Sequence, residues 1–99
     1  RNDLLTIWLE LKTVRQRDWP KKPGTPTDFG LDTDQGTWHF VYNRNKGTSY
    51  ILVFIQHLDE YWVFSGKHGI TLAEKRSTGL LKQISKQFKT LNEALDFIL

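Results

Sequence analysis

The sequence contains no cysteine and no long hydrophobic run. Without cysteine the chain cannot form a disulfide, a thiolate zinc site or a cysteine nucleophile. Its longest unbroken apolar run, Ile51 to Ile55, is far shorter than the roughly 20 residues that a membrane-spanning helix needs. We therefore expect an intracellular domain that does not contact a membrane.

Methionine is absent as well, and the sequence begins with Arg1. A free-standing gene product normally begins with methionine, so we expect residues 1–99 to be a single domain of a longer protein. Other domains of that parent protein are then candidate partners. The 99 residues include 4 Trp, 3 Tyr and 6 Phe, and this aromatic content indicates a folded chain, because disordered chains lack large apolar side chains.

The formal net charge is only +3, but the basic residues are clustered. Residues 12–22 carry five basic side chains against Asp18 alone, and residues 67–89 carry six against Glu74 alone. Clustered positive charge attracts polyanions and makes the attraction sensitive to salt. For any single lysine, a solvated position on the surface is the more ordinary explanation.

The N-terminal third predicts a helix followed by a long connection. Apolar residues recur at helical spacing over 3–17, although the alternation over 6–14 leaves a strand open as the alternative. Residues 18–36 hold all three prolines and three of the seven glycines and lack a clear period, so we expect a long loop there. Trp19, Phe29 and Leu31 are the side chains expected to attach this loop to the core.

The centre of the sequence predicts three strands over 37–43, 48–57 and 60–65, which are rich in β-branched and aromatic residues. Short turns around Asn45–Gly47 and Asp59 indicate a three-stranded antiparallel meander. The resulting register places Phe54 opposite Phe64 and gathers aromatic side chains on one face, at Trp38, Phe40, Tyr42, Tyr50, Phe54, Trp62 and Phe64. Both faces of the middle strand are apolar, so either both are covered or one meets a partner.

The C-terminal third predicts one or two helices. Thr71 and Glu74 have the spacing of a capping box, and Gly79 is expected to interrupt the helix that they begin. Residues 80–88 continue a helical stripe, with a strand over 83–88 as the alternative. Thr90 and Glu93 form a second capping-box pattern before a short final helix. The predicted fold is α+β: the antiparallel meander with an N-terminal helix and one or two C-terminal helices.

Nucleic-acid binding is the function that this pattern favours. Aromatic rings on an open sheet can stack on unpaired bases while nearby lysine and arginine hold phosphates. The predicted contacts lie at the hairpin tip, on the aromatic sheet face and around the glycine loop: Arg44, Lys46, Tyr42, Tyr50, Lys67, His68, Lys75 and Arg76. The alternative is a protein-interaction module that docks a partner through an exposed aromatic sheet face. The aromatic cluster is also compatible with a buried core, and the sequence does not distinguish DNA from RNA or single from double strands.

Gly66-Lys67-His68-Gly69 matches the G-x-x-G loop that clamps a nucleic-acid backbone in KH domains. A simple turn from strand to helix accounts for the same four residues. The predicted order of helix, three strands and helix is similar to that of double-stranded-RNA-binding domains, in which a basic loop and the following helix contact phosphates.

No catalytic motif is present, and we expect no active site within these residues, although the parent protein can be an enzyme. Ser65 beside His68 lacks an orienting acid, and His57 lies next to Asp59 and Glu60 at a turn. The acidic residues Asp28, Asp32 and Asp34 do not have the spacing of a calcium loop. We therefore expect neither a metal nor a cofactor.

Overall fold

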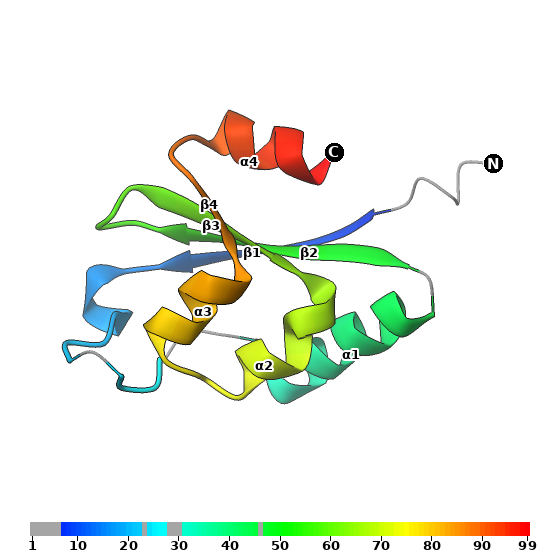
Figure 1. Ribbon diagram of the computed structural model, residues 1–99, viewed down its shortest axis with the longest axis horizontal. Helices are drawn as coiled ribbons and strands as arrows, with labels where there is room; N and C mark the ends of the chain where they lie inside the picture. The colour runs from blue at the N-terminus through cyan, green and yellow to red at the C-terminus, as the bar shows by residue number, and fades with distance from the viewer. Residues whose placement is uncertain (1–6, 23, 28–30, 46) are drawn as a thin grey trace.

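The computed structural model describes residues 7–22, 24–27, 31–45 and 47–99. The fold is α+β, with a four-stranded mixed sheet in the order β1-β2-β3-β4 and four α-helices among these residues. Three helices, α1, α2 and α3, cover one face of the sheet, and α4 lies on the other (Figure 1). The prediction of an α+β fold is confirmed, but the three-stranded antiparallel meander with an N-terminal helix is wrong in detail.

The N-terminal segment is a strand rather than a helix. β1 runs from Ile7 to Val14 and pairs in parallel with β2, and a short 3-10 helix η2 follows at Gln16–Asp18. Ile7, Leu9 and Leu11 alternate with Trp8, Glu10 and Lys12, so each face of the sheet receives every second side chain. The strand predicted as the alternative from the alternation over 6–14 is therefore correct, and the helix predicted from the helical spacing is wrong. Residues 3–6 of the predicted helix lie outside the described residues.

The first predicted strand, 37–43, is instead part of helix α1, which runs from Thr33 to Arg44. The face of α1 that packs inward carries Gly36, His39 and Asn43, which are small or polar. Trp38 is 65% exposed on its outer side. An apolar stripe, the usual sign of a helix, is therefore missing, and the β-branched and aromatic composition misleads. With this strand absent, the similarity to the element order of double-stranded-RNA-binding domains does not hold.

The second and third predicted strands are confirmed in part as β2, Thr48–Ile55, and β3, Glu60–Ser65, which pair antiparallel. Their register differs from the prediction. Phe54 lies opposite Tyr61 instead of Phe64, because a four-residue turn over 56–59, with Asp59 at φ 54°, closes the hairpin. Since the shift is an odd number of residues, it moves Trp62 and Phe64 to the other face.

After β3 the chain forms a 3-10 helix η3, Gly66–His68, and the helices α2, Gly69–Ala73, and α3, Thr78–Ile84. Neither predicted boundary is right here: α2 begins before Thr71, and Gly79 lies within α3. A short strand β4, Lys86–Phe88, then pairs antiparallel with β3, so the predicted alternative of a strand near 83–88 is partly correct. The final helix α4 runs from Leu91 to Ile98, and the Thr90 side chain accepts a hydrogen bond from the Glu93 amide, as the capping pattern predicts.

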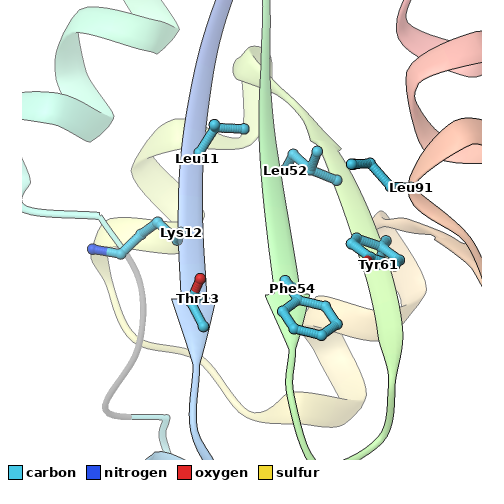
Figure 2. A pocket seen from close by; sticks show the side chains of 7 residues that line it. All are labelled: Leu11, Lys12, Thr13, Leu52, Phe54, Tyr61 and Leu91. Carbon is cyan, nitrogen blue, oxygen red and sulfur yellow. The ribbon is translucent and has the colours of Figure 1, made fainter.

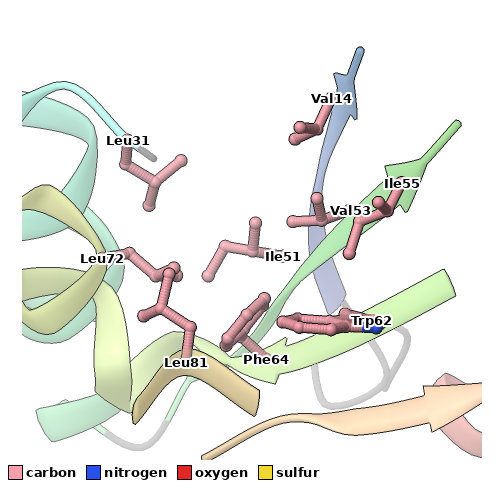
Figure 3. Packing of buried hydrophobic residues seen from close by; sticks show 9 residues of the cluster. All are labelled: Val14, Leu31, Ile51, Val53, Ile55, Trp62, Phe64, Leu72 and Leu81. Carbon is pink, nitrogen blue, oxygen red and sulfur yellow. The ribbon is translucent and has the colours of Figure 1, made fainter. Parts of the chain in front are cut away.

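Both faces of β2 are covered, as its two apolar faces require. Ile51, Val53 and Ile55 point toward α1, α2 and α3, where they pack with Trp62, Phe64, Leu72 and Leu81 (Figure 3). Leu52 points the other way and packs with Val63 of β3 and with Ala94 and Ile98 of α4. The aromatic side chains predicted to share one face are thus divided between two faces and helix α1.

Gly36 of α1 and Gly69 of α2 bring the two helices into backbone contact. A Cβ atom added at Gly36 would lie 2.5 Å from the carbonyl oxygen of Gly69, and one added at Gly69 would collide with the carbonyl oxygen of Gly36. Gly66 packs closely against the side chains of Ser49 in β2 and Asn43 in α1. Both glycines of the G-x-x-G pattern are therefore explained by close packing inside the fold, Gly69 against the backbone of α1 and Gly66 against two side chains.

The predicted long connection between β1 and α1 is held against the body at several points. Trp19 packs edge-on against Trp62, with ring centroids 5.7 Å apart, and Leu31 is buried in the core. Thr27 donates a backbone hydrogen bond to the carbonyl oxygen of Arg76 at 3.2 Å. The predicted attachment through Trp19 and Leu31 is confirmed, whereas Phe29 lies outside the described residues. Over the part of the chain that the structure describes, no helix is long and apolar enough to cross a membrane.

Candidate nucleic-acid interface

Three of the predicted contact residues, Tyr50, Lys67 and His68, line one cleft of about 270 Å³. The cleft opens on the α4 face, where β3 ends and β4 begins. Its polar lining comes from the end of β3, from η3 and from the junction of α3 with β4: Ser65, Lys67, His68, Gln83, Ser85 and Lys86. Its apolar wall consists of Tyr50, Val63, Ile84 and Phe97. We call this hollow the basic cleft.

The charge of the basic cleft is positive and unopposed. Lys67 and Lys86 line it, and no carboxylate is among the described residues of its lining. Two acidic side chains of this half of the chain are paired with basic residues outside the cleft. Glu60 holds Lys89 at 3.1 Å, and Glu74 holds Arg76 at 3.4 Å. Both lysines of the cleft remain available to an anion.

His68 contributes a neutral polar group at physiological pH. Partial burial lowers the pKa of its imidazole below the usual 6.5, and the nearby positive charge of Lys67 lowers this pKa further. A neutral imidazole has one N–H donor and one acceptor nitrogen. The side chain can thus exchange hydrogen bonds with a ligand without adding charge.

One wall of the basic cleft is aromatic. The rings of Tyr50 and Phe97 meet edge to face with their centroids 6.2 Å apart, and Phe97 also contacts Phe88 at 5.5 Å. Phe97 is 44% exposed, so part of its ring faces solvent. Aromatic rings held in this way can stack on a planar ligand.

Arg44, predicted at the hairpin tip, is the last residue of α1, because residues 37–44 are helical and form no strand of a hairpin. The guanidinium of Arg44 lies 5.6 Å from the ring centroid of Phe40. Tyr42 packs edge-on against Trp8 with ring centroids 5.7 Å apart and lies beside Gly47. Neither residue lines the basic cleft. Lys46 lies outside the described residues.

Lys75 and Arg76 lie in the connection between α2 and α3, and neither lines the cleft. Lys75 adopts a left-handed backbone conformation at φ 55°, which allows the sharp turn. The Arg76 carbonyl accepts the hydrogen bond from Thr27, and its side chain pairs with Glu74. The predicted site is therefore divided into the basic cleft and two separate basic positions.

The sequence reasoning missed Gln83, Ser85, Lys86 and Phe97 as lining residues. Lys86 belongs to the basic cluster over 67–89, so its charge was a usable signal. The sequence did not indicate where Lys86 lies, because β4 is only three residues long and pairs with β3 alone. The helix predicted over 80–88 does not include the turn at Ser85, and this turn brings Lys86 to the cleft.

A buried polar network, also missed, joins α1 to the sheet. His39 is fully buried, with Nδ1 2.8 Å from Ser49 Oγ and Nε2 3.3 Å from Glu10 Oε1. Asn43 donates to Ser49 Oγ at 2.7 Å, and Gln35 donates to the second Glu10 oxygen at 3.4 Å. These bonds are all satisfied when Ser49 donates to Nδ1 and the imidazole donates from Nε2 to Glu10.

The order of serine, histidine and carboxylate is that of a hydrolytic triad, but the serine is enclosed. Ser49 is 1% exposed, and Gly66 packs directly on its hydroxyl. The indole of Trp8 stacks on the imidazole with ring centroids 3.9 Å apart. A substrate carbonyl cannot reach this hydroxyl in the folded structure. The network instead fixes α1 on β1 and β2, because buried polar groups stabilise a fold only when they are all paired.

The sequence matches no protein-family model, and neither a curated protein nor a solved structure is significantly similar to it. In the described part of the chain, no three histidine, aspartate or glutamate side chains are grouped so that they could hold a metal ion. The geometry of the residues therefore supplies the functional argument.

Proposed function

We propose that this chain binds nucleic acid through the basic cleft. The observation that carries the proposal is the pair Lys67 and Lys86 in a hollow whose described lining has no carboxylate. Phosphate groups are the natural ligands of such a pair, since each lysine that neutralises a phosphate releases condensed counterions.

The aromatic wall favours a strand with unpaired bases. Phe97 exposes part of its ring beside the lysines, and a base can stack on that ring only when it is not held inside a duplex. Ser65, Gln83 and Ser85 add hydrogen-bonding groups that can contact sugar or base edges. At about 270 Å³ the hollow is slightly smaller than the roughly 300–1,000 Å³ of sites that enclose a whole small ligand. This size suits one nucleotide unit of a longer strand.

The proposal is tested by fluorescence anisotropy with labelled single-stranded and double-stranded oligonucleotides at two salt concentrations. Two phosphate contacts on a single strand predict that Kd rises about sevenfold between roughly 50 and 200 mM salt. Phe97→Leu keeps an apolar side chain against Phe88 but removes the stacking ring, and it should weaken single-strand binding by about fivefold or more. An absence of binding to every oligonucleotide at low salt contradicts the proposal.

The alternative of a protein-interaction module now depends on a different surface from the one predicted. Trp38, Phe40 and Tyr42 belong to α1 and form no part of a sheet face. The exposed apolar residues of the sheet lie beside β1, at the other end of α4 from the basic cleft.

A further inference from the structure

β1 is an edge strand with one side unpaired. It lies at the end of the sheet order and pairs with β2 alone among the described elements. Every second residue of this eight-residue strand directs its backbone N–H and C=O groups to the outer side, away from β2. Such an edge is a template for pairing with another strand.

An apolar hollow of about 170 Å³ lies next to this edge on the α4 face. Leu11, Leu52, Phe54 and Leu91 face it, and Figure 2 shows Leu11 and Leu52 side by side on neighbouring strands. Leu11 is 67% exposed, which is unusual for a leucine in the middle of a strand. The free edge and the exposed apolar face therefore belong to one continuous surface.

The sequence of β1 is complementary to itself. When two copies of a strand pair antiparallel, directly opposite residues lie on the same face, so the two-fold axis must lie midway between a residue and its own copy. We name each axis after that residue. Two positions of the axis pair nearly all residues of the strand with the other copy, one at Glu10 and one at Leu11. The Glu10 axis places two carboxylates opposite each other, which is unfavourable.

The Leu11 axis pairs unlike charges instead. Glu10 of each copy then lies opposite Lys12 of the other, so two ion pairs form on the helix-covered face. On the α4 face Leu11 meets Leu11, and Leu9 meets Thr13. The Glu10 side chain is 24% exposed while bonded to His39, so its carboxylate can also accept a bond from a lysine across the edge. Lys12 is among the residues that line the apolar hollow, but its ammonium group lies on the side of β1 away from Leu52 and Phe54 (Figure 2).

We propose that two copies of this chain associate through β1, antiparallel and in the register centred on Leu11, and so form one continuous sheet. The pairing covers the exposed edge of each copy and buries the two Leu11 side chains against each other. It leaves the basic cleft of each copy free, because the cleft lies at the other end of α4.

The register is tested by cross-linking, for which the cysteine-free chain is well suited. In this register the Cα atoms of the two Leu11 residues lie about 4.5–5.5 Å apart, within the range of about 4.4–6.8 Å that a disulfide spans. Leu11→Cys should therefore form a disulfide-linked dimer on mild oxidation. Thr13→Cys is the matched control and should not, because its own copy is displaced by four residues, about 13 Å along the strand. Efficient cross-linking of Thr13→Cys, or none of Leu11→Cys, overturns the register.

The charge pairing is tested by analytical ultracentrifugation of the 99-residue chain over a range of concentrations. Lys12→Glu converts two attractive pairs into two repulsive ones and should raise the dimer dissociation constant about tenfold or more. Circular dichroism checks that the variant folds. The opposite view is that Lys12 is a charge that prevents edge pairing, in which case Lys12→Gln strengthens association. Stronger association of Lys12→Gln, or a monomer at every concentration for the unmodified chain, overturns the proposal.

Discussion

The two faces of the sheet are covered to very different extents. On one face α1, α2 and α3 exclude solvent almost completely, and Ile51, Ile55 and Phe64 have no exposed surface. On the other face the eight-residue α4 covers only part of the sheet, so that Leu11 of β1 remains exposed, and Phe97 of α4 itself is also partly exposed. The two hollows described above lie on this second face, beside the two ends of α4. One face therefore supplies stability, and the other supplies the surfaces available for binding.

The largest expected effect compares the same residue type on the two faces. Phe64→Ala leaves a cavity among fully buried neighbours and should lower the free energy of unfolding by about 3–5 kcal/mol. Phe88→Ala removes a half-buried ring on the α4 face and should cost about 1–2 kcal/mol. Urea unfolding of both variants measures the difference. Equal costs would show that the two faces contribute alike.

The second prediction concerns the contact between α1 and α2. Gly69→Ala forces a methyl group against the backbone oxygen of Gly36 and should destabilise the fold by about 1–3 kcal/mol or more. Gly79→Ala is the matched control, because no atom lies within 4 Å of the added Cβ and the residue is inside helix α3. The control should be neutral or stabilising by up to about 1 kcal/mol. Thermal unfolding of the two variants compares them, and a Gly69→Ala protein as stable as the control contradicts the close contact.

Sequence reasoning recovers the parts of this fold that are specified locally. Turn residues and side-chain types predict the strands over 48–55 and 60–65 and the burial of both faces of β2. The capping-box pattern predicts the Thr90 cap. The region of α1 fails because its partners are distant in sequence: Gly36 contacts Gly69, and His39 reaches Glu10, 29 residues away. A helix whose inner face consists of glycine, histidine and asparagine has no apolar period to detect.

In the candidate site, too, the residues with a local signal were predicted and those that depend on distant contacts were not. Lys67 and His68 were predicted because they follow a strand in a basic cluster, which is a local signal. Lys67 lies close to Lys86 and Phe97 because β4 pairs with β3 and because α4 packs on the sheet. The spacing of residues in the sequence predicts neither contact. Arg44 and Tyr42 were placed on a hairpin that does not exist, because the composition favours a strand and no apolar period indicates the helix.

The third prediction tests the buried polar network. Ser49→Ala removes the hydrogen-bond partner of His39 Nδ1 inside a closed interface and should lower stability by about 1–3 kcal/mol, since a buried polar group is left unpaired. Thr48→Ala, at the exposed neighbouring position of β2, should change stability by no more than about 0.5 kcal/mol. Chemical denaturation distinguishes the two. If Ser49→Ala is as mild as Thr48→Ala, the network does not fix α1.

The smallest expected effect is a pH dependence at the basic cleft. Because the folded state lowers the pKa of His68 below 6.5, the unfolded chain binds its proton more tightly. This residue's contribution to stability is therefore complete above pH 6.5 and declines as the pH falls through the folded pKa. An NMR titration should give a pKa below 6.5, and Lys67→Ala should raise it part of the way back, because burial remains the larger cause. Lys75→Ala should leave it unchanged, and an unperturbed His68 would contradict the geometry.

The most direct test of the proposed function removes equal charge from two places. Lys67→Ala/Lys86→Ala empties the basic cleft of its lysines, whereas Lys21→Ala/Lys22→Ala removes the same charge from an exposed stretch of the long connection. Measured against one single-stranded oligonucleotide at one low salt concentration, the first pair should weaken binding by about tenfold or more and the second by less than about threefold. Equal losses for the two pairs would show that overall charge, and not the cleft on the α4 face, attracts the nucleic acid.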